Sequence, residues 1–144
     1  MKRVLFIDTR NTARSPIAEA FFNHLTRETM CAYSCGTMPG QKIDPLVVTV
    51  MKEVGIDLRT HVPRMVNQQS LADADVVILM GKDVYPRAFS PKAIWNFQDP
   101  SGKPLTSYRE LRDAIRLNVL KLVAEIRRTS AAPREPDRTL AASL

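Results

Sequence analysis

The chain has 144 residues, of which 44% are hydrophobic and 25% charged, as in an ordinary globular domain with a packed core. No apolar run approaches the roughly 18 residues of a membrane span, and Val4–Ile7 is too short for a signal peptide, so we expect a cytoplasmic protein without a membrane partner. The net charge of +6 lies partly along one late helix and in the tail. Because no zinc-ligand spacing or aromatic RNA-binding motif accompanies it, we expect a solvated basic surface, no nucleic-acid partner and no metal.

The first half of the chain alternates strand-like and helical segments. Residues 2–7 are a strand candidate, because their unbroken apolar run Val4–Ile7 is typical of a buried parallel strand. Residues 16–28 carry apolar side chains at helical spacing, and residues 31–36 return as a strand. The Asp-Pro pair at residues 44–45 predicts a helix start, and Gly55 predicts the end of that helix.

The second half continues the alternation. Residues 66–72 predict a short helix, residues 75–80 the clearest buried strand, and residues 93–97 a weaker fourth strand. Residues 108–128 predict an amphipathic helix. Its apolar positions are Leu111, Ile115, Leu117, Leu120, Leu122, Val123 and Ile126. Residues 130–144, rich in Ala, Arg and Pro, are predicted to form a disordered tail.

Helices between strands imply right-handed crossovers, and therefore an α/β fold with a doubly wound, four-stranded parallel sheet flanked by helices. We expect one domain over residues 1–129. Ligands of such sheets bind at the carboxyl ends of the strands, where the strand order reverses. The loop after the first strand is therefore the expected site.

The loop of residues 8–15 contains the hydrogen-bond donors that an anion-binding site needs. Backbone N–H groups of a loop that leads into a helix favour a tetrahedral oxyanion, and Arg14 can add a planar, two-pronged donor. Asn11 tolerates the left-handed backbone that such loops need. The candidate phosphate-binding residues are Thr9, Arg10, Asn11, Thr12, Ala13, Arg14 and Ser15. The expected ligand is a phosphate-like oxyanion or a phosphorylated substrate.

The loop resembles the phosphate-binding loop of the low-molecular-weight protein tyrosine phosphatases and the related thioredoxin-type arsenate reductases. Their pattern is Cys, any five residues, Arg, Ser. The resemblance runs from Met1 to about Ile126. It includes Cys35-Gly36-Thr37 for the family's Ala-Gly-Thr, the Gly-Ile-Asp … His … Arg stretch from Gly55 to Arg64, the third strand at residues 75–80, and Asp99-Pro100 for the pair that carries the general acid.

The resemblance implies hydrolysis of phosphomonoesters such as phosphotyrosine, without a cofactor. A thiolate at position 8 would attack phosphorus, the loop amides and Arg14 would stabilise the transferred group, and Asp99 would protonate the leaving group. Ser15 would lower the pKa of the thiolate. Thioredoxin-coupled arsenate reduction needs two further cysteines after the third strand, and residues 81–91 contain none. That mechanism is therefore excluded.

Position 8 departs from the pattern because it holds Asp8 instead of the nucleophilic cysteine. The carboxylate could fold into the loop and accept the hydrogen bonds of the amides and Arg14. It could instead be protonated and allow anion binding without turnover, or act as an aspartyl nucleophile. Arg10 replaces a frequent glycine and could pair with Asp8 or guard the entrance. With Asp8, Arg14 and Asp99 in the catalytic positions, we expect impaired or absent phosphatase activity.

The sequence is also compatible with other interpretations. The chain could be a non-enzymatic pseudophosphatase that binds an anion or a protein partner, or an arsenate-reductase-derived protein that has lost its redox cysteines. A haloacid-dehalogenase-like phosphatase also places Asp after its first strand, but it needs a second acid where Arg10 stands. Cys31 and Cys35, about 13 Å apart on one strand, are too distant for a disulfide, and we expect two buried thiols.

Overall fold

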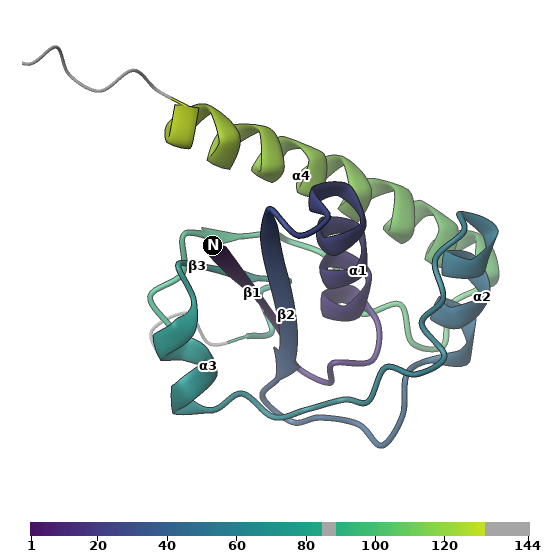
Figure 1. Ribbon diagram of the computed structural model, residues 1–144. Coiled ribbons are helices and arrows are strands. Elements are labelled where there is room, and N and C mark those ends of the chain that lie inside the picture. Colours follow the sequence, from purple (N-terminus) through teal and green to yellow (C-terminus); the bar gives the residue numbers. More distant parts are fainter. Residues whose placement is uncertain (85–88, 132–144) are drawn as a thin grey trace, which may run out of the picture.

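The computed structural model describes residues 1–84 and 89–131. Strands and helices alternate through most of the chain (Figure 1). In chain order they are β1 (Lys2–Asp8), α1 (Arg14–Thr26), β2 (Met30–Gly36), α2 (Pro45–Glu53), α3 (Gln68–Asp73), β3 (Val76–Leu79), β4 (Ala93–Ile94) and α4 (Leu105–Ala131). Among these residues, none of the helices combines the length and the apolar content needed to cross a bilayer.

The four strands form one parallel sheet in the order β2-β1-β3-β4. This confirms the predicted fold class. The chain leaves β1 for β2 on one side and later returns to β3 on the other, so the strand order reverses at β1. Asp8, the last residue of β1, pairs in register with Gly36, the last residue of β2. The carboxyl end of β1 is therefore the position at which such sheets bind ligands.

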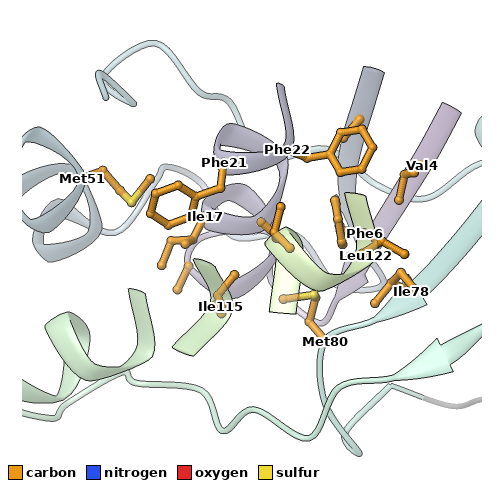
Figure 2. Close-up of a cluster of buried hydrophobic side chains, with 14 of the residues drawn as sticks. Val4, Phe6, Ile17, Phe21, Phe22, Met51, Ile78, Met80, Ile115 and Leu122 are labelled. Carbon is orange, nitrogen blue, oxygen red and sulfur yellow. The ribbon is translucent and has the colours of Figure 1, made fainter. Parts of the chain in front are cut away.

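Hydrophobic side chains cover both faces of β1. Val4 and Phe6 belong to the larger cluster, which lies between the sheet, α1 and α4 and extends to side chains of α2 (Figure 2). Leu5 and Ile7 belong to a smaller cluster on the opposite face, with Leu71 of α3 at its margin. Because successive strand residues point to opposite faces, burial on both faces explains the unbroken apolar run of β1.

The predicted elements are present, but several boundaries differ. Helix α1 begins at Arg14 and ends at Thr26, not at residues 16 and 28. It stops early because Arg27 and Glu28 have positive φ values of 36° and 63°, which a right-handed helix cannot contain. Helix α2 begins as predicted: the Asp44 carboxylate accepts a hydrogen bond from the backbone N–H of Leu46 at 2.9 Å.

The last helix corrects two predictions. It spans residues 105–131, so the first two residues of the predicted tail are helical, and residues 132–144 lie outside the described part of the chain. Leu117, assigned to the apolar stripe, is 56% exposed, whereas Val119 is fully buried. Val119 lies four residues after the buried Ile115 and shares its face of the helix.

The two cysteines lie on β2 as free thiols. Cys35 is buried, whereas Cys31 is half-buried, so the prediction that both thiols are buried was wrong for Cys31. Cys31 differs because β2 is an edge strand of the sheet and its burial is uneven along its length.

Candidate functional site

The loop between β1 and α1 wraps around the side chain of Asp8. The Asp8 carboxylate accepts two backbone hydrogen bonds, from Asn11 N at 2.7 Å and from Ser15 N at 2.8 Å. The residue is only 2% exposed. Burial raises the pKa of Asp8, while the hydrogen bonds from Ser15 and Asn11 and the charge of Arg14 act in the opposite direction.

This arrangement is close to the first one expected for Asp8, with a carboxylate that accepts the loop amides. The prediction that Arg14 also donates to Asp8 was wrong, because the Arg14 guanidinium donates to Asp83 and to the Phe97 carbonyl instead. Of the two roles considered for Arg10, pairing with Asp8 is absent: Arg10 is exposed, and the hydrogen bonds of the Asp8 carboxylate come from the Asn11 and Ser15 amides.

Arg14 forms a bidentate ion pair with Asp83, a residue that follows β3 and lies 69 positions later in the chain. The Nη1 and Nη2 groups each donate to one carboxylate oxygen of Asp83 at 2.7 Å, and Nη1 also donates to the carbonyl of Phe97 at 3.0 Å. The Arg14 side chain is 3% exposed and that of Asp83 is 44% exposed. The hydrogen bonds from Arg14 hold the pKa of Asp83 at about 2.

Several donors of the loop have no acceptor among the residues that the structure describes. They include Nε and one Nη2 hydrogen of Arg14, which together form one edge of the guanidinium. They also include the backbone N–H groups of Arg10, Thr12, Ala13 and Arg14. These donors are the ones that remain for an external oxyanion.

Asn11 fastens the loop to three other parts of the fold. Its φ of 55° is the expected left-handed conformation. The side-chain amide donates to Ser15 Oγ at 2.8 Å and to Ser34 Oγ of β2 at 2.9 Å, and its oxygen accepts from the backbone N–H of Arg64 at 3.0 Å. Asn11 is fully buried and all its polar groups are engaged, so it specifies one loop shape.

A buried polar network continues from Asn11. Ser34 Oγ donates to Glu19 Oε2 of α1 at 2.9 Å, and His61 places Nδ1 3.6 Å from the same oxygen and Nε2 3.1 Å from Asn11 Oδ1. Burial raises the pKa of Glu19 and lowers the pKa of His61. Ser34 and Glu19 were not among the residues predicted for the site. Their signal was a polar residue inside an otherwise apolar strand or helix.

Asp99 lies near the site but outside the loop. It is half-buried, and its Oδ1 accepts hydrogen bonds from Ser101 N at 3.0 Å and Ser101 Oγ at 2.8 Å. It comes two residues after Phe97, whose carbonyl accepts a hydrogen bond from Arg14 at 3.0 Å. Asp8, Arg14 and Asp99 therefore lie in one region of the fold. Asp83 was not among the residues predicted for the site. A polar residue just after a buried parallel strand could have indicated it.

Two glycines allow the segments of the site to approach closely. A side chain at Gly36 would bring its Cβ within 2.6 Å of the Thr9 carbonyl oxygen. A Cβ at Gly81 would collide with Nη1 of Arg14 and the Asp83 carboxylate. The loop therefore depends on the absence of side chains at both neighbouring strand ends.

The metal-dependent alternative needs a second acid two residues after Asp8, and Arg10 stands there. Within residues 1–84 and 89–131, no group of three or more His, Cys, Asp or Glu residues could hold a metal ion.

Comparisons with known proteins identify two groups of relatives, low molecular weight protein tyrosine phosphatases and arsenate reductases. The family model for low molecular weight phosphotyrosine protein phosphatase matches residues 3–132. Arsenate reductase 2 of Staphylococcus epidermidis is 31% identical over 121 residues, covering 80% of this chain and 91% of that protein. The glutaredoxin arsenate reductase of Synechocystis sp. is 30% identical over 131 residues, covering 88% and 99%.

Solved structures agree with these sequence matches. An arsenate reductase in its phosphate-binding state superposes with a TM-score of 0.79 at 31% identity, covering 88% of this chain and 99% of that one. A low molecular weight protein tyrosine phosphatase from T. tengcongensis superposes with a TM-score of 0.77 at 27% identity, covering 87% and 99%.

Proposed function

Because the chain belongs to the low molecular weight phosphotyrosine protein phosphatase family, we propose that its residue 8–15 loop binds phosphate-type oxyanions but hydrolyses phosphomonoesters poorly or not at all. In this proposal Asp8 stands where the family's nucleophilic cysteine belongs, and Arg14 and Asp99 keep the positions of the oxyanion donor and the general acid. The observation that carries the proposal is the buried Asp8 carboxylate, which accepts hydrogen bonds from the Asn11 and Ser15 amides.

A carboxylate in this position is a poor nucleophile for three reasons. Each of its oxygens already accepts a hydrogen bond. Burial raises the pKa of Asp8, which increases the neutral, non-nucleophilic fraction. An ionised carboxylate also repels an incoming phosphate: two unit charges about 4 Å apart interact by roughly 4 kcal/mol at an effective dielectric constant of about 20.

Binding without turnover is supported by the donors that remain. In the loop, the N–H groups of Arg10, Thr12, Ala13 and Arg14 and one guanidinium edge have no acceptor among the described residues. The related arsenate reductase of known structure is described in a phosphate-binding state. A weak oxyanion site is therefore consistent with both the geometry and the family.

Thiol redox chemistry is not favoured as the alternative. Cys35 is buried, and burial together with the nearby Asp8 charge raises the pKa of its thiol to about 12. Because the thiolate is the reactive form, Cys35 is inert near neutral pH. An origin from an arsenate reductase is compatible with the relatives, but the two thiols of β2 do not form a redox pair.

The experiment is a comparison of phosphate release from para-nitrophenyl phosphate by the wild-type protein, Asp8→Cys and Asp8→Ala. We expect wild type and Asp8→Ala to remain at background and Asp8→Cys to gain activity that Asp99→Asn in the same background reduces. Robust wild-type turnover that Asp8→Ala abolishes would contradict the proposal. An 80 Da mass increase on Asp8 would then establish the aspartyl-nucleophile alternative.

A further inference from the structure

Three segments lie side by side next to the loop between β1 and α1: residues 9–10, 36–42 and 59–66, called here the basic rim. In Figure 1 the loops after β1 and β2 and the loop before α3 run along the same edge of the molecule. Their backbones are joined by hydrogen bonds from Met38 N to Thr9 O (2.7 Å), from Gly40 N to Arg10 O (2.9 Å) and from Gly36 N to Arg64 O (2.9 Å).

The basic rim exposes three large apolar side chains. Met38 is 72% exposed, Val62 is 70% exposed and Met65 is 59% exposed. Met65 pairs with Gly36 in an isolated parallel bridge, so Met38 and Met65 come from adjacent segments. Flexible, polarisable methionine side chains adapt to apolar partners, and exposed apolar groups gathered at one place mark interaction surfaces.

The charge of the basic rim has one sign. Its segments contain Arg10, Lys42, Arg59 and Arg64 and no aspartate or glutamate. Arg59 pairs with Asp57 just outside the rim, and Arg64 reaches Glu19 at 3.4 Å while its side chain stays 52% exposed. Arg10 and Lys42 are exposed and form no ion pair with the described residues. The rim therefore complements a negatively charged partner.

A groove of about 560 Å³ extends the basic rim toward α2. Its lining combines the aliphatic side chains of Ile43, Val48 and Val62 with Lys42 and Arg59. Apolar groups beside cations suit a chain that alternates acidic and apolar residues. The rim has no Trp, Tyr or Phe, the side chains on which single-stranded nucleic acid stacks, so the residue types favour protein over nucleic acid.

We propose that the basic rim binds an acidic segment of a partner protein through its cations, with apolar side chains of that segment seated on Met38, Met65 and the adjoining groove. The backbone hydrogen bonds between the three segments hold the rim in place before binding, which reduces the ordering cost of association. This interaction does not require turnover in the loop, so it holds or fails independently of the proposed function.

The test is fluorescence anisotropy of a labelled eight-residue peptide, Glu-Leu-Asp-Phe-Glu-Leu-Asp-Glu, titrated with the full chain at low salt. Two comparison peptides replace every acid by Lys or every apolar residue by Ser. We expect the first peptide to bind and both comparison peptides to bind about tenfold more weakly, since rim charges and apolar anchors each contribute modestly.

Variants then locate the surface. We expect the double change Arg10→Glu and Lys42→Glu to weaken binding about tenfold, and Met38→Ser with Met65→Ser to weaken it by about the same factor. The matched control is Leu117→Ser with Lys121→Glu on the exposed face of α4, which should leave binding unchanged. Thermal unfolding of each variant shows that it is folded.

Three outcomes would overturn the proposal. The acidic peptide could fail to bind, the methionine variant could bind as wild type does, or the α4 control could lose as much affinity as the rim variants. A fourth outcome, equal affinity for single-stranded oligothymidylate and for the peptide, would overturn it as well, because the rim would then be a non-specific polyanion surface.

Discussion

Removing the Asp8 carboxylate should open the loop to external anions. Asp8→Ala deletes a buried negative charge from the centre of the loop and frees the N–H groups of Asn11 and Ser15 that it now occupies. The same backbone donors would then face a sulfate or phosphate ion. The expected result is a large gain in oxyanion affinity relative to wild type.

The magnitude follows from charge and hydrogen bonding. Repulsion between Asp8 and an anion about 4 Å away is worth roughly 4 kcal/mol at an effective dielectric constant of about 20, which is close to a thousandfold in affinity. The raised pKa of Asp8 reduces this value, because a neutral carboxyl does not repel the anion. We therefore expect a gain between about tenfold and a thousandfold.

The assay is isothermal titration with sulfate at low ionic strength, supported by unfolding experiments. An Asp8→Ala site with a Kd near 1 mM would raise the free energy of unfolding by about 1.8 kcal/mol in 20 mM sulfate, and wild type would show little change. Lowering the pH should strengthen sulfate binding to wild type and leave Asp8→Ala unaffected, because burial lets Asp8 protonate above its ordinary range.

Asp75→Ala is the matched control. Asp75 also accepts a backbone N–H, from Arg3 at 2.8 Å, but it is exposed and precedes β3 at the opposite end of the strand from the loop. The Asp75→Ala substitution removes one carboxylate, as Asp8→Ala does, but leaves the residue 8–15 loop unchanged. Equal sulfate affinities of wild type and Asp8→Ala would refute the reasoning, as would an equal gain in Asp75→Ala.

Other changes test the surroundings of the loop. Gly36→Ala should cost about 1–3 kcal/mol in the free energy of unfolding, measured with urea, because the new Cβ meets the Thr9 carbonyl oxygen at 2.6 Å; an unchanged midpoint would show that the loop yields freely. The pKa of His61 in the folded protein lies below its ordinary value, so the folded state binds fewer protons than the unfolded state and its stability should fall as pH decreases from about 6.5. His61→Gln should flatten that part of the curve of unfolding free energy against pH, and an unaltered slope would contradict the reasoning. Iodoacetamide at pH 8 should label half-buried Cys31 and spare Cys35, whose pKa is about 12, as read by mass spectrometry; preferential labelling of Cys35 would be the opposite result.

Local sequence patterns were sufficient to predict the fold. The apolar run of β1, the Asp-Pro start of α2 and the alternation of elements depend on near neighbours in the chain, and the structure contains them. The end of α1 was mispredicted because Arg27 and Glu28 adopt left-handed backbone that their residue types do not indicate.

The hydrogen-bond partners within the site were harder to predict from the sequence than the fold. The amide contacts of Asp8 are local, within seven residues, and one of the three expected arrangements anticipated them. The partner of Arg14 comes from another strand end, and no spacing rule connects two residues 69 positions apart. Glu19 and Ser34 meet only because α1 packs on β2, which is a tertiary fact.

The attachment of Asn11 has a consequence for how the loop can respond to a ligand. One side chain joins the loop to α1, β2 and the segment before α3, so a shift of the loop backbone must break several buried bonds together. Anion binding to the loop should therefore cause a collective, two-state rearrangement of the loop and its neighbours, and not a gradual local adjustment. Amide resonances of Ser34 and Arg64 would report it from a distance, changing in step with those of the loop itself.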